Sequence, residues 1–349
     1  MKRLHALLLS HFIVAVMSAL VGLIHGAPLT YFFLYKGSDS LAVTSPPAPI
    51  IMRFAGDCLL AGYYEEAAGD DPELAFRDFD ALRSADIAMV NLECPITTKG
   101  RKVAKPFNFR MNPKFLGALK ASGVDIVNIA NNHIFDYGGD GLFDTIAYLD
   151  SVGIHYVGAG RNGEEAHHPV VIDAGAQRIG FLGYYGGGEA PGATEDHPGV
   201  ARRDIEAIAA DIRSLRARDS VGFVVVNLHW GTENADAPDR PEREFAHRVI
   251  DAGADAIIGH HPHVLQGIER YKSGVIVYSL GNFIFGGNSR DTYDTGLFEI
   301  RLGASTTEYE FIPIRVRGWK ASVLRGAEAH AVLDRVQRLS SRFPKSIFQ

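Results

Sequence analysis

The chain has 349 residues, of which 46% are hydrophobic and 22% charged. This composition is that of an ordinary globular protein and excludes disordered, collagen-like and disulfide-scaffold classes. The net charge of −6 has the wrong sign for a protein that binds nucleic acid by releasing counterions, so we expect no nucleic-acid partner. Two cysteines can neither staple a fold of this size nor form a four-cysteine zinc site.

The amino-terminal residues 1–35 have the composition of a membrane segment. Lys2 and Arg3 precede Leu4–Tyr35, a run of 32 residues without a charge. A helix needs about 20 apolar residues to cross a bilayer, and the basic end predicts a cytoplasmic amino terminus. We therefore expect a single-pass anchor in the cell membrane with an extracytoplasmic body. A signal peptide cleaved after Ala27 is one alternative, and a hydrophobic hairpin buried in the fold is another.

Residues 36–49 are rich in Ser and Pro and are expected to form a linker. From residue 50 onward, short apolar runs alternate with amphipathic stretches. The runs predict strands at 50–55, 87–92, 124–130, 154–157, 179–184, 222–228, 254–258, 275–280, 297–302 and 309–316. The amphipathic stretches predict helices at 72–83, 112–122, 139–151, 203–216, 240–252 and 327–343.

Alternating strands and helices predict a layered α/β fold, because nearly continuous apolar strands are buried on both faces. The later strands follow one another without helices, so one sheet is expected to be mixed or antiparallel. The last helix, 327–343, is expected to pack on the outside.

Six of the predicted strands are followed at once by polar residues. These groups are Gly56-Asp57, Asn91-Leu92-Glu93, Asn131-Asn132-His133, His229–Glu233, Gly259–His263 and Ser279–Asn282. Ligands bind at the carboxyl ends of strands in open α/β sheets, and rigid strands hold metal ligands well. Imidazoles mixed with carboxylate and amide oxygens suit one or two divalent transition-metal ions, Mn, Fe or Zn. Each group alone also fits a turn, a helix cap or a buried core histidine.

The order of the motifs GD, NLECP, NNHxxD, HWGTE, GHHPHV and YSLGNFIF resembles the CapA/PgsA capsule-synthesis family. Members of this family are linked to poly-γ-glutamate biosynthesis and export and are distant relatives of calcineurin-like metallophosphoesterases. The resemblance covers residues 51–302. It implies a two-sheet sandwich flanked by helices (α/β/β/α) that spans 50–302, with 303–349 adding a strand and a helix.

The resemblance also implies a ligand set. Asp57 is expected to bind one metal, Glu93 to bridge two, and Asn132 with His229 to bind the second. The pair His261 and His263 is expected to supply one imidazole to each metal.

Two further residues match the family's proton-transfer group. His133 is similar to a histidine that acts as a general acid, and Asp136 is placed to orient its ring. His260 has no counterpart and is expected to support the ligands. The family's related phosphoesterases carry a histidine where this chain has Leu59, so the first metal site is expected to lose a ligand.

Two features lie outside the resemblance. Lys99–Arg110 contains five basic residues and no acidic one. If this segment overhangs the site, Lys105 and Arg110 are candidates to bind phosphate or the carboxylates of a polymer; a solvated loop is the alternative. Cys58 and Cys94 each follow an expected ligand, and either form a disulfide or stay as two buried thiols.

The resulting expectation is a metal-dependent hydrolase or transferase in poly-γ-glutamate capsule or related polymer synthesis. Its partners are expected to be the membrane, the polyanionic polymer or its phosphorylated precursor, and integral-membrane capsule synthase subunits. A non-catalytic assembly or polymer-binding subunit is the alternative, and a scavenging phosphomonoesterase is a third possibility.

Overall fold

The computed structural model describes residues 48–349. The predicted membrane segment 1–35 and nearly all of the linker 36–49 lie outside the described residues. Within residues 48–349, no helix is both long enough and apolar enough to cross a membrane.

The first of two large sheets has eight strands in the order β16-β15-β14-β1-β2-β3-β4, with β13 also paired to β1. Its strands are β1 (Ile50–Leu59), β2 (Ile87–Leu92), β3 (Ile126–Asn128), β4 (His155–Val157), β13 (Asn282–Phe285), β14 (Thr292–Leu302), β15 (Thr307–Arg317) and β16 (Lys320–Val323). β1 to β4 and β13 run parallel, whereas β14, β15 and β16 pair antiparallel. The expected mixed sheet is therefore confirmed.

The second sheet has six strands in the order β11-β12-β10-β9-β7-β6. They are β6 (Val170–Ala174), β7 (Gln177–Tyr185), β9 (Phe223–His229), β10 (Ala256–His260), β11 (Ile268–Tyr271) and β12 (Gly274–Val277). The four central strands are parallel, and the two edge strands are antiparallel. A separate pair is formed by β5 (Ala159–Gly160) and β8 (Gly199–Val200).

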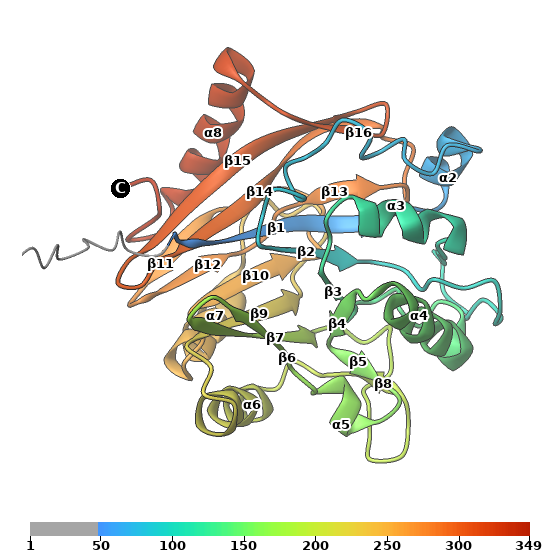
Figure 1. Cartoon of the computed structure of the whole chain (residues 1–349), viewed down its shortest axis with the longest axis horizontal. Helices are drawn as coiled ribbons and strands as arrows, with labels where there is room; N and C mark the ends of the chain where they lie inside the picture. Colours follow the sequence, from blue (N-terminus) through green and yellow to red (C-terminus); the bar gives the residue numbers. More distant parts are fainter. Residues whose placement is uncertain (1–47) are drawn as a thin grey trace, which may run out of the picture. The chain divides into compact units, whose positions relative to one another are not determined.

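Helices cover the outer faces of the two sheets (Figure 1). The helices are α2 (Tyr63–Ala68), η1 (Pro113–Phe115), α3 (Leu116–Ala121), α4 (Gly138–Val152), α5 (Gly163–Ala166), α6 (Ile205–Arg218), α7 (Arg240–Asp251) and α8 (Gly326–Ser340). α3 and α4 pack on the first sheet, and α6 and α7 on the second. Asp239 caps α7 through a reciprocal capping box with Glu242, which explains why this helix begins where the sequence predicts.

The apolar core between the sheets holds side chains from both of them. Phe54 of β1 and Phe298 of β14 meet Val225 of β9 and Ile258 of β10 there, all at most 1% exposed. The predicted α/β sandwich with helices on both sides is thus confirmed. Because β1, β2, β3, β7, β9 and β10 are parallel within their sheets, each sheet brings its carboxyl ends to one edge.

One predicted helix differs from the structure, and another agrees with it. Residues 72–83 form successive turns rather than a helix, because the backbone there bonds elsewhere: the carbonyl of Ala75 accepts a hydrogen bond from Ala321 of β16. α8 packs on the outside, as the sequence predicts, with most of its side chains exposed. It contacts β15 and β11, and its apolar side chains close one end of the core between the two sheets.

Candidate functional site

Strand register gathers the polar residues of the two sheets. In the first sheet, Asp57 lies beside Asn91 of β2, and Asn91 lies beside Asn128 of β3. In the second sheet, His229 at the end of β9 lies beside His260 at the end of β10. All five residues are at most 1% exposed, so the site lies within the protein rather than on its surface.

The two carboxylates Asp57 and Glu93 share one hydrogen-bond donor, the side-chain amide of Asn91. Its Nδ2 lies 2.9 Å from Asp57 Oδ1 and 3.1 Å from Glu93 Oε2. Its Oδ1 accepts hydrogen bonds from the amides of Asn128 and Asn131. Sequence reasoning did not assign Asn91 a role. The available signal was its spacing from Glu93, since residues two apart share one face of a strand.

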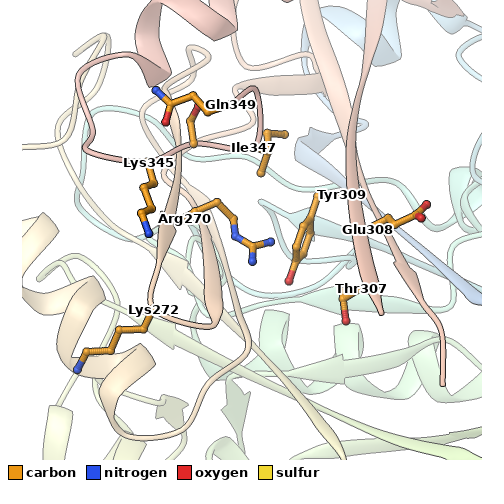
Figure 2. A pocket seen from close by; sticks show the side chains of 9 residues that line it. Arg270, Lys272, Thr307, Glu308, Tyr309, Lys345, Ile347 and Gln349 are labelled. Carbon is orange, nitrogen blue, oxygen red and sulfur yellow. The ribbon is translucent and has the colours of Figure 1, made fainter. Parts of the chain in front are cut away.

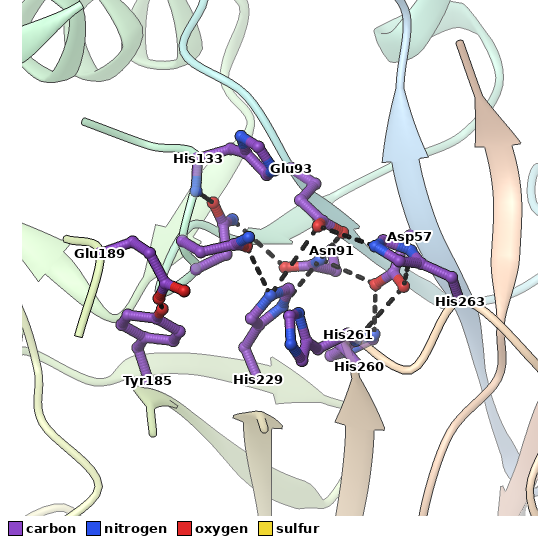
Figure 3. Close-up of polar contacts among 12 residues, drawn as sticks. Asp57, Asn91, Glu93, His133, Tyr185, Glu189, His229, His260, His261 and His263 are labelled. Carbon is purple, nitrogen blue, oxygen red and sulfur yellow. Dashed lines mark hydrogen bonds and ion pairs between the residues drawn. The ribbon is translucent and has the colours of Figure 1, made fainter. Parts of the chain in front are cut away.

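The imidazoles of His229 and His263 lie near Glu93 Oε1, the carboxylate oxygen that Asn91 does not contact (Figure 3). Glu93 Oε1 lies 3.6 Å from His263 Nε2 and 3.8 Å from His229 Nε2. His229 Nε2 also lies 2.8 Å from Asn132 Oδ1. The structure thus places Asn132, His229 and Glu93 together, as the resemblance implies.

The segment His260–His263 turns sharply as it leaves β10. His261 and His263 have φ values of 98° and 59°, a region that non-glycine residues rarely adopt. The turn lets the amide of His261 donate to Asp57 Oδ2 at 3.3 Å. It also places His263 Nδ1 3.2 Å from Asp57 Oδ2 and 2.9 Å from Asn282 Oδ1. Backbone in such a conformation costs roughly 1–3 kcal/mol, and it is concentrated at functional sites.

The donor set fits a divalent transition metal. The ligand atoms of Glu93, His261 and His263 lie within 4.8 Å of one another, as do those of Asp57, Glu93 and His229. Among residues 48–349, Glu93 Oε1 and His261 Nδ1 are buried without a hydrogen-bond partner. Such orphaned polar atoms are costly in a folded protein unless something else pairs with them. Imidazole and carboxylate ligands together match Zn, Mn or Fe(II).

Burial and neighbouring charges shift the pKa values of these groups in different directions. Burial alone would raise the pKa of Asp57, but contacts with His260 and His263 outweigh burial and hold the pKa well below its usual range. Burial, with the charge of Asp57, raises the pKa of Glu93 well above its usual range. Burial, with neighbouring imidazoles, lowers the pKa values of His229 and His261, which keeps both rings neutral and able to bind a metal.

His133 and Asp136 form a contact next to this cluster. His133 Nδ1 lies 2.8 Å from Asp136 Oδ2, which leaves Nε2 free of that contact. The ammonium group of Lys105 forms an ion pair with Asp136 and donates to the carbonyl of Asn132 at 2.7 Å. The pair therefore has the geometry that the resemblance implies. Burial lowers the pKa of His133, although the hydrogen bond to Asp136 opposes the shift.

The basic segment 99–110 reaches the site through Lys105 but not through Arg110. The guanidinium of Arg110 lies over the ring of Tyr137 at 4.7 Å, and its side chain is exposed.

Cys58 and Cys94 are free buried thiols, so the structure contains no disulfide between them. Leu59, at the position of the absent histidine, is fully buried in an apolar core.

Another cavity, of about 650 Å³, lies between the end of β11, the start of β15 and residues 345–349 (Figure 2). There the guanidinium of Arg270 lies 4.6 Å from the centre of the Tyr309 ring, and Lys272 is paired with Asp251. Neither of the two ligand clusters found among the described residues lies in this cavity. The candidate site is therefore the cluster at the carboxyl ends.

Comparisons with known proteins agree with the resemblance. A family model described as bacterial capsule synthesis protein PGA_cap matches residues 52–287. The capsule biosynthesis protein CapA of Bacillus anthracis is 31% identical over 278 residues, which cover 77% of this chain and 68% of that protein. The PGA biosynthesis protein CapA of Bacillus subtilis (strain 168) is 34% identical over 273 residues, which cover 75% of this chain and 70% of that protein.

Solved structures are more distant. A hypothetical protein from Thermus thermophilus gives a TM-score of 0.49 at 15% identity, covering 76% of this chain and 100% of that chain. The NAD nucleotidase of Haemophilus influenzae gives 0.41 at 14% identity, covering 66% of this chain and 49% of that chain. Similarity at this level says nothing of the reaction that this chain performs.

Proposed function

The chain belongs to the PGA_cap family of bacterial capsule synthesis proteins, and we propose that it acts in poly-γ-glutamate capsule or related polymer biosynthesis and export as a metal-dependent hydrolase or transferase. The observation that supports an enzyme is the buried cluster of Asp57, Glu93, His229, His261 and His263, in which Glu93 Oε1 and His261 Nδ1 lack partners among the described residues. The relatives' names support the polymer.

In this proposal Asp57, Glu93, Asn132, His229, His261 and His263 hold one or two divalent ions. When bound, these ions supply Lewis acidity toward a phosphoryl or γ-glutamyl carbonyl oxygen. Asn91 fixes both carboxylates by donating to each of them. The strained turn at His261 and His263 keeps their rings facing the carboxylates.

In this proposal His133 transfers a proton to the leaving group. Its Nδ1 is held by Asp136, so Nε2 is the atom that exchanges a proton with the leaving group. The pKa of the ring is lowered by burial, and a negatively charged substrate group beside it raises that pKa again. His133 is then able to act as a general acid once the substrate is in place. Lys105 forms an ion pair with Asp136 and so holds its carboxylate in position.

We place this activity outside the cytoplasm, on a membrane anchor formed by the apolar run Leu4–Tyr35. Two measurements test this placement. The full-length protein should sediment with membranes, and protease added to intact protoplasts or spheroplasts should digest residues 50–349. A chain found in the soluble cell fraction, or protected from the protease, would contradict it.

The activity is tested with full-length protein loaded with Mn, Fe or Zn. The assay measures newly formed amino groups from poly-γ-glutamate, transfer of γ-glutamyl units to an added amine, and phosphate release from an aryl phosphate. We expect metal-dependent turnover of a γ-glutamyl substrate or phosphoester, lost in the His261→Ala/His263→Ala double variant. Full metal loading without turnover of any of these substrates would contradict an enzyme.

A non-catalytic assembly subunit is the second candidate, and Leu59 favours it. This leucine is fully buried in an apolar core at the position where related phosphoesterases have a ligand. The variant His133→Asn separates the two candidates. Polymer production in a capsule-forming host stops if His133 moves protons and continues if the protein only assembles the synthase.

A further inference from the structure

A cavity of about 330 Å³ opens beside His261, next to the ligand cluster. We call it the Arg203 pocket; it lies between the loop Gly186–Glu189 after β7, the segment Trp230–Thr232 after β9 and the start of α7. Its volume is at the lower end of the roughly 300–1,000 Å³ that small-molecule sites have. Because His261 lines the pocket and also faces Glu93 and His263, a ligand in the pocket reaches the cluster.

Arg203 supplies the positive charge of the Arg203 pocket. Its guanidinium lies 4.9 Å from the centre of the Phe245 ring and 5.9 Å from the Trp230 ring. Its backbone amide bonds to the carbonyl of Tyr185, which fixes it at the end of β7. Among residues 48–349, no carboxylate or carbonyl accepts a hydrogen bond from this guanidinium. A half-buried arginine with unused donors is suited to bind a carboxylate.

The neighbouring Arg202 shows the contrast. Its guanidinium donates to the carbonyls of Gly187 and Ala190 and so holds the glycine loop in place. Gly186 packs directly against Arg203, since a Cβ there would lie 2.9 Å from Arg203 Nε. Arg202 thus stabilises the wall of the pocket, whereas the guanidinium of Arg203 is free to bind a ligand inside it.

The remaining charges of the pocket are negative. Glu189, Asp239 and Glu242 line it together with Arg203. Each of these acids uses one oxygen within the protein: Glu189 accepts from Tyr185, Asp239 from the amide of Glu242, and Glu242 from the amide of Asp239. The second oxygens of Asp239 and Glu242 accept no hydrogen bond within the described part of the chain. Three carboxylates and one guanidinium repel a phosphate dianion but match a ligand that carries one carboxylate and one ammonium group.

We propose that the Arg203 pocket binds the free amino end of a γ-linked glutamyl chain, with Arg203 pairing its α-carboxylate and the acids of the pocket pairing its α-ammonium group. This inference rests on the proposed function for the choice of polymer and adds which end of the chain is recognised. The neighbouring γ-amide bond then points from the pocket toward His261 and the ligand cluster.

The test measures binding of γ-glutamylglutamate to full-length, metal-loaded protein by isothermal titration calorimetry. Two modified probes remove one charge each: the N-acetyl derivative lacks the ammonium group, and the α-carboxamide at the amino end lacks the carboxylate. We expect each modification to weaken binding about ten- to a hundredfold, as loss of a charged hydrogen bond does. Equal affinity for all three probes, or no binding of the unmodified dipeptide at millimolar concentration, would overturn the assignment.

Substitutions test whether Arg203 binds the dipeptide. Arg203→Gln is expected to lose the same factor in affinity while it keeps the metal content of the wild type. Gly186→Ala keeps the charge but displaces the guanidinium, and it should weaken binding as well. Arg248→Gln makes the same charge change on α7 at a side chain that is 59% exposed, and it should bind normally. Unchanged affinity of Arg203→Gln for the dipeptide refutes the proposal.

The outcome separates this inference from the proposed function. Binding that depends on Arg203 without metal-dependent turnover would retain the pocket and reject the enzyme. Turnover that is insensitive to Arg203→Gln would retain the enzyme and reject the pocket.

Discussion

The Nδ2 amide of Asn91 lies 2.9 Å from Oδ1 of Asp57, at paired positions of β2 and β1. The same amide donates to Glu93, and its oxygen accepts from two further asparagines. An asparagine can both donate and accept, so it joins carboxylates on one side to amides on the other. Asn91 thereby neutralises part of the repulsion between two buried acids before any metal binds.

Replacing Asn91 with Ala should destabilise the fold. The change removes one hydrogen-bond partner from the buried amide of Asn128 and one from the carboxylate of Asp57, at about 1–3 kcal/mol for each group. Urea denaturation in the presence of a chelator measures the loss. Asn288→Ala, at an exposed position, is the control and should stay within about 0.5 kcal/mol of the wild type. A similarly small effect of Asn91→Ala would show that the network contributes little.

Gly56→Ala should disturb the site through the backbone. A Cβ at Gly56 would lie 1.9 Å from the carbonyl oxygen of Gly281, which also accepts the amide of Asp57. The turn before β13 must therefore move away from β1, at roughly 1–3 kcal/mol or more. Gly117→Ala, at an exposed position of helix α3 with open space around it, should instead gain about 0.5–1 kcal/mol. Thermal unfolding of both variants gives the comparison, and equal melting temperatures would contradict it.

Asp144→Asn should lower stability in a manner that depends on pH. Burial would raise the pKa of Asp144, but hydrogen bonds from Lys99 and Thr97 outweigh it and lower the pKa. A lowered pKa means that the stabilisation is present above the ordinary value of about 3.9 and is lost as pH falls through the folded-state pKa.

We therefore expect Asp144→Asn to cost about 1 kcal/mol at pH 7, because the hydrogen bond from Thr97 then goes to a neutral amide oxygen instead of a carboxylate. The ion pair with Lys99 contributes little, since Lys99 is 70% exposed. The difference from the wild type should shrink at pH 3. Asp150→Asn makes the same charge change at an exposed position of α4. Denaturant unfolding at both pH values checks the expectation, and a difference that grows at pH 3 would refute it.

Much of the fold follows from strand patterning. Ile87–Leu92 was predicted with the bounds of β2, because a strand buried on both faces reads as an unbroken apolar run that ends near its first charged residue. The same pattern located the polar groups at the strand ends. β1 was predicted only to Ala55 because Gly56-Asp57 reads as a turn, whereas the strand continues through an irregularity to Leu59.

Other features depend on contacts that no local pattern reveals. Asp71-Pro72 is typical of a helix start, yet the residues after it form turns, in which Phe76 and Phe79 pack on Phe283 of β13. The pairing of β13 with β1 joins residues more than 200 positions apart. Asn91 meets Asp57 only through the pairing of β2 with β1, and Asn282 meets His263 only through the turn after β10, so their roles at the candidate site were not predicted.

Metal binding should stabilise the full-length chain. A ligand that binds only the folded state adds about 2.7 kcal/mol when present at 100 times its dissociation constant. We expect Mn, Fe or Zn to raise the melting temperature and a chelator to reverse the change. Because burial and Asp57 raise the pKa of Glu93, binding displaces a proton, and the shift should weaken as pH falls.

Elemental analysis of the same samples decides how many ions the cluster holds. About two ions per chain would support a binuclear site, whereas about one would match the burial of Leu59 in the apolar core. His261→Ala/His263→Ala should abolish both the bound metal and the stabilisation. His197→Ala changes a histidine whose side chain is 74% exposed, so it should retain both. Folded wild-type protein that takes up no metal, or a double variant that binds as well as the wild type, would show that the orphaned oxygen of Glu93 is paired in some other way.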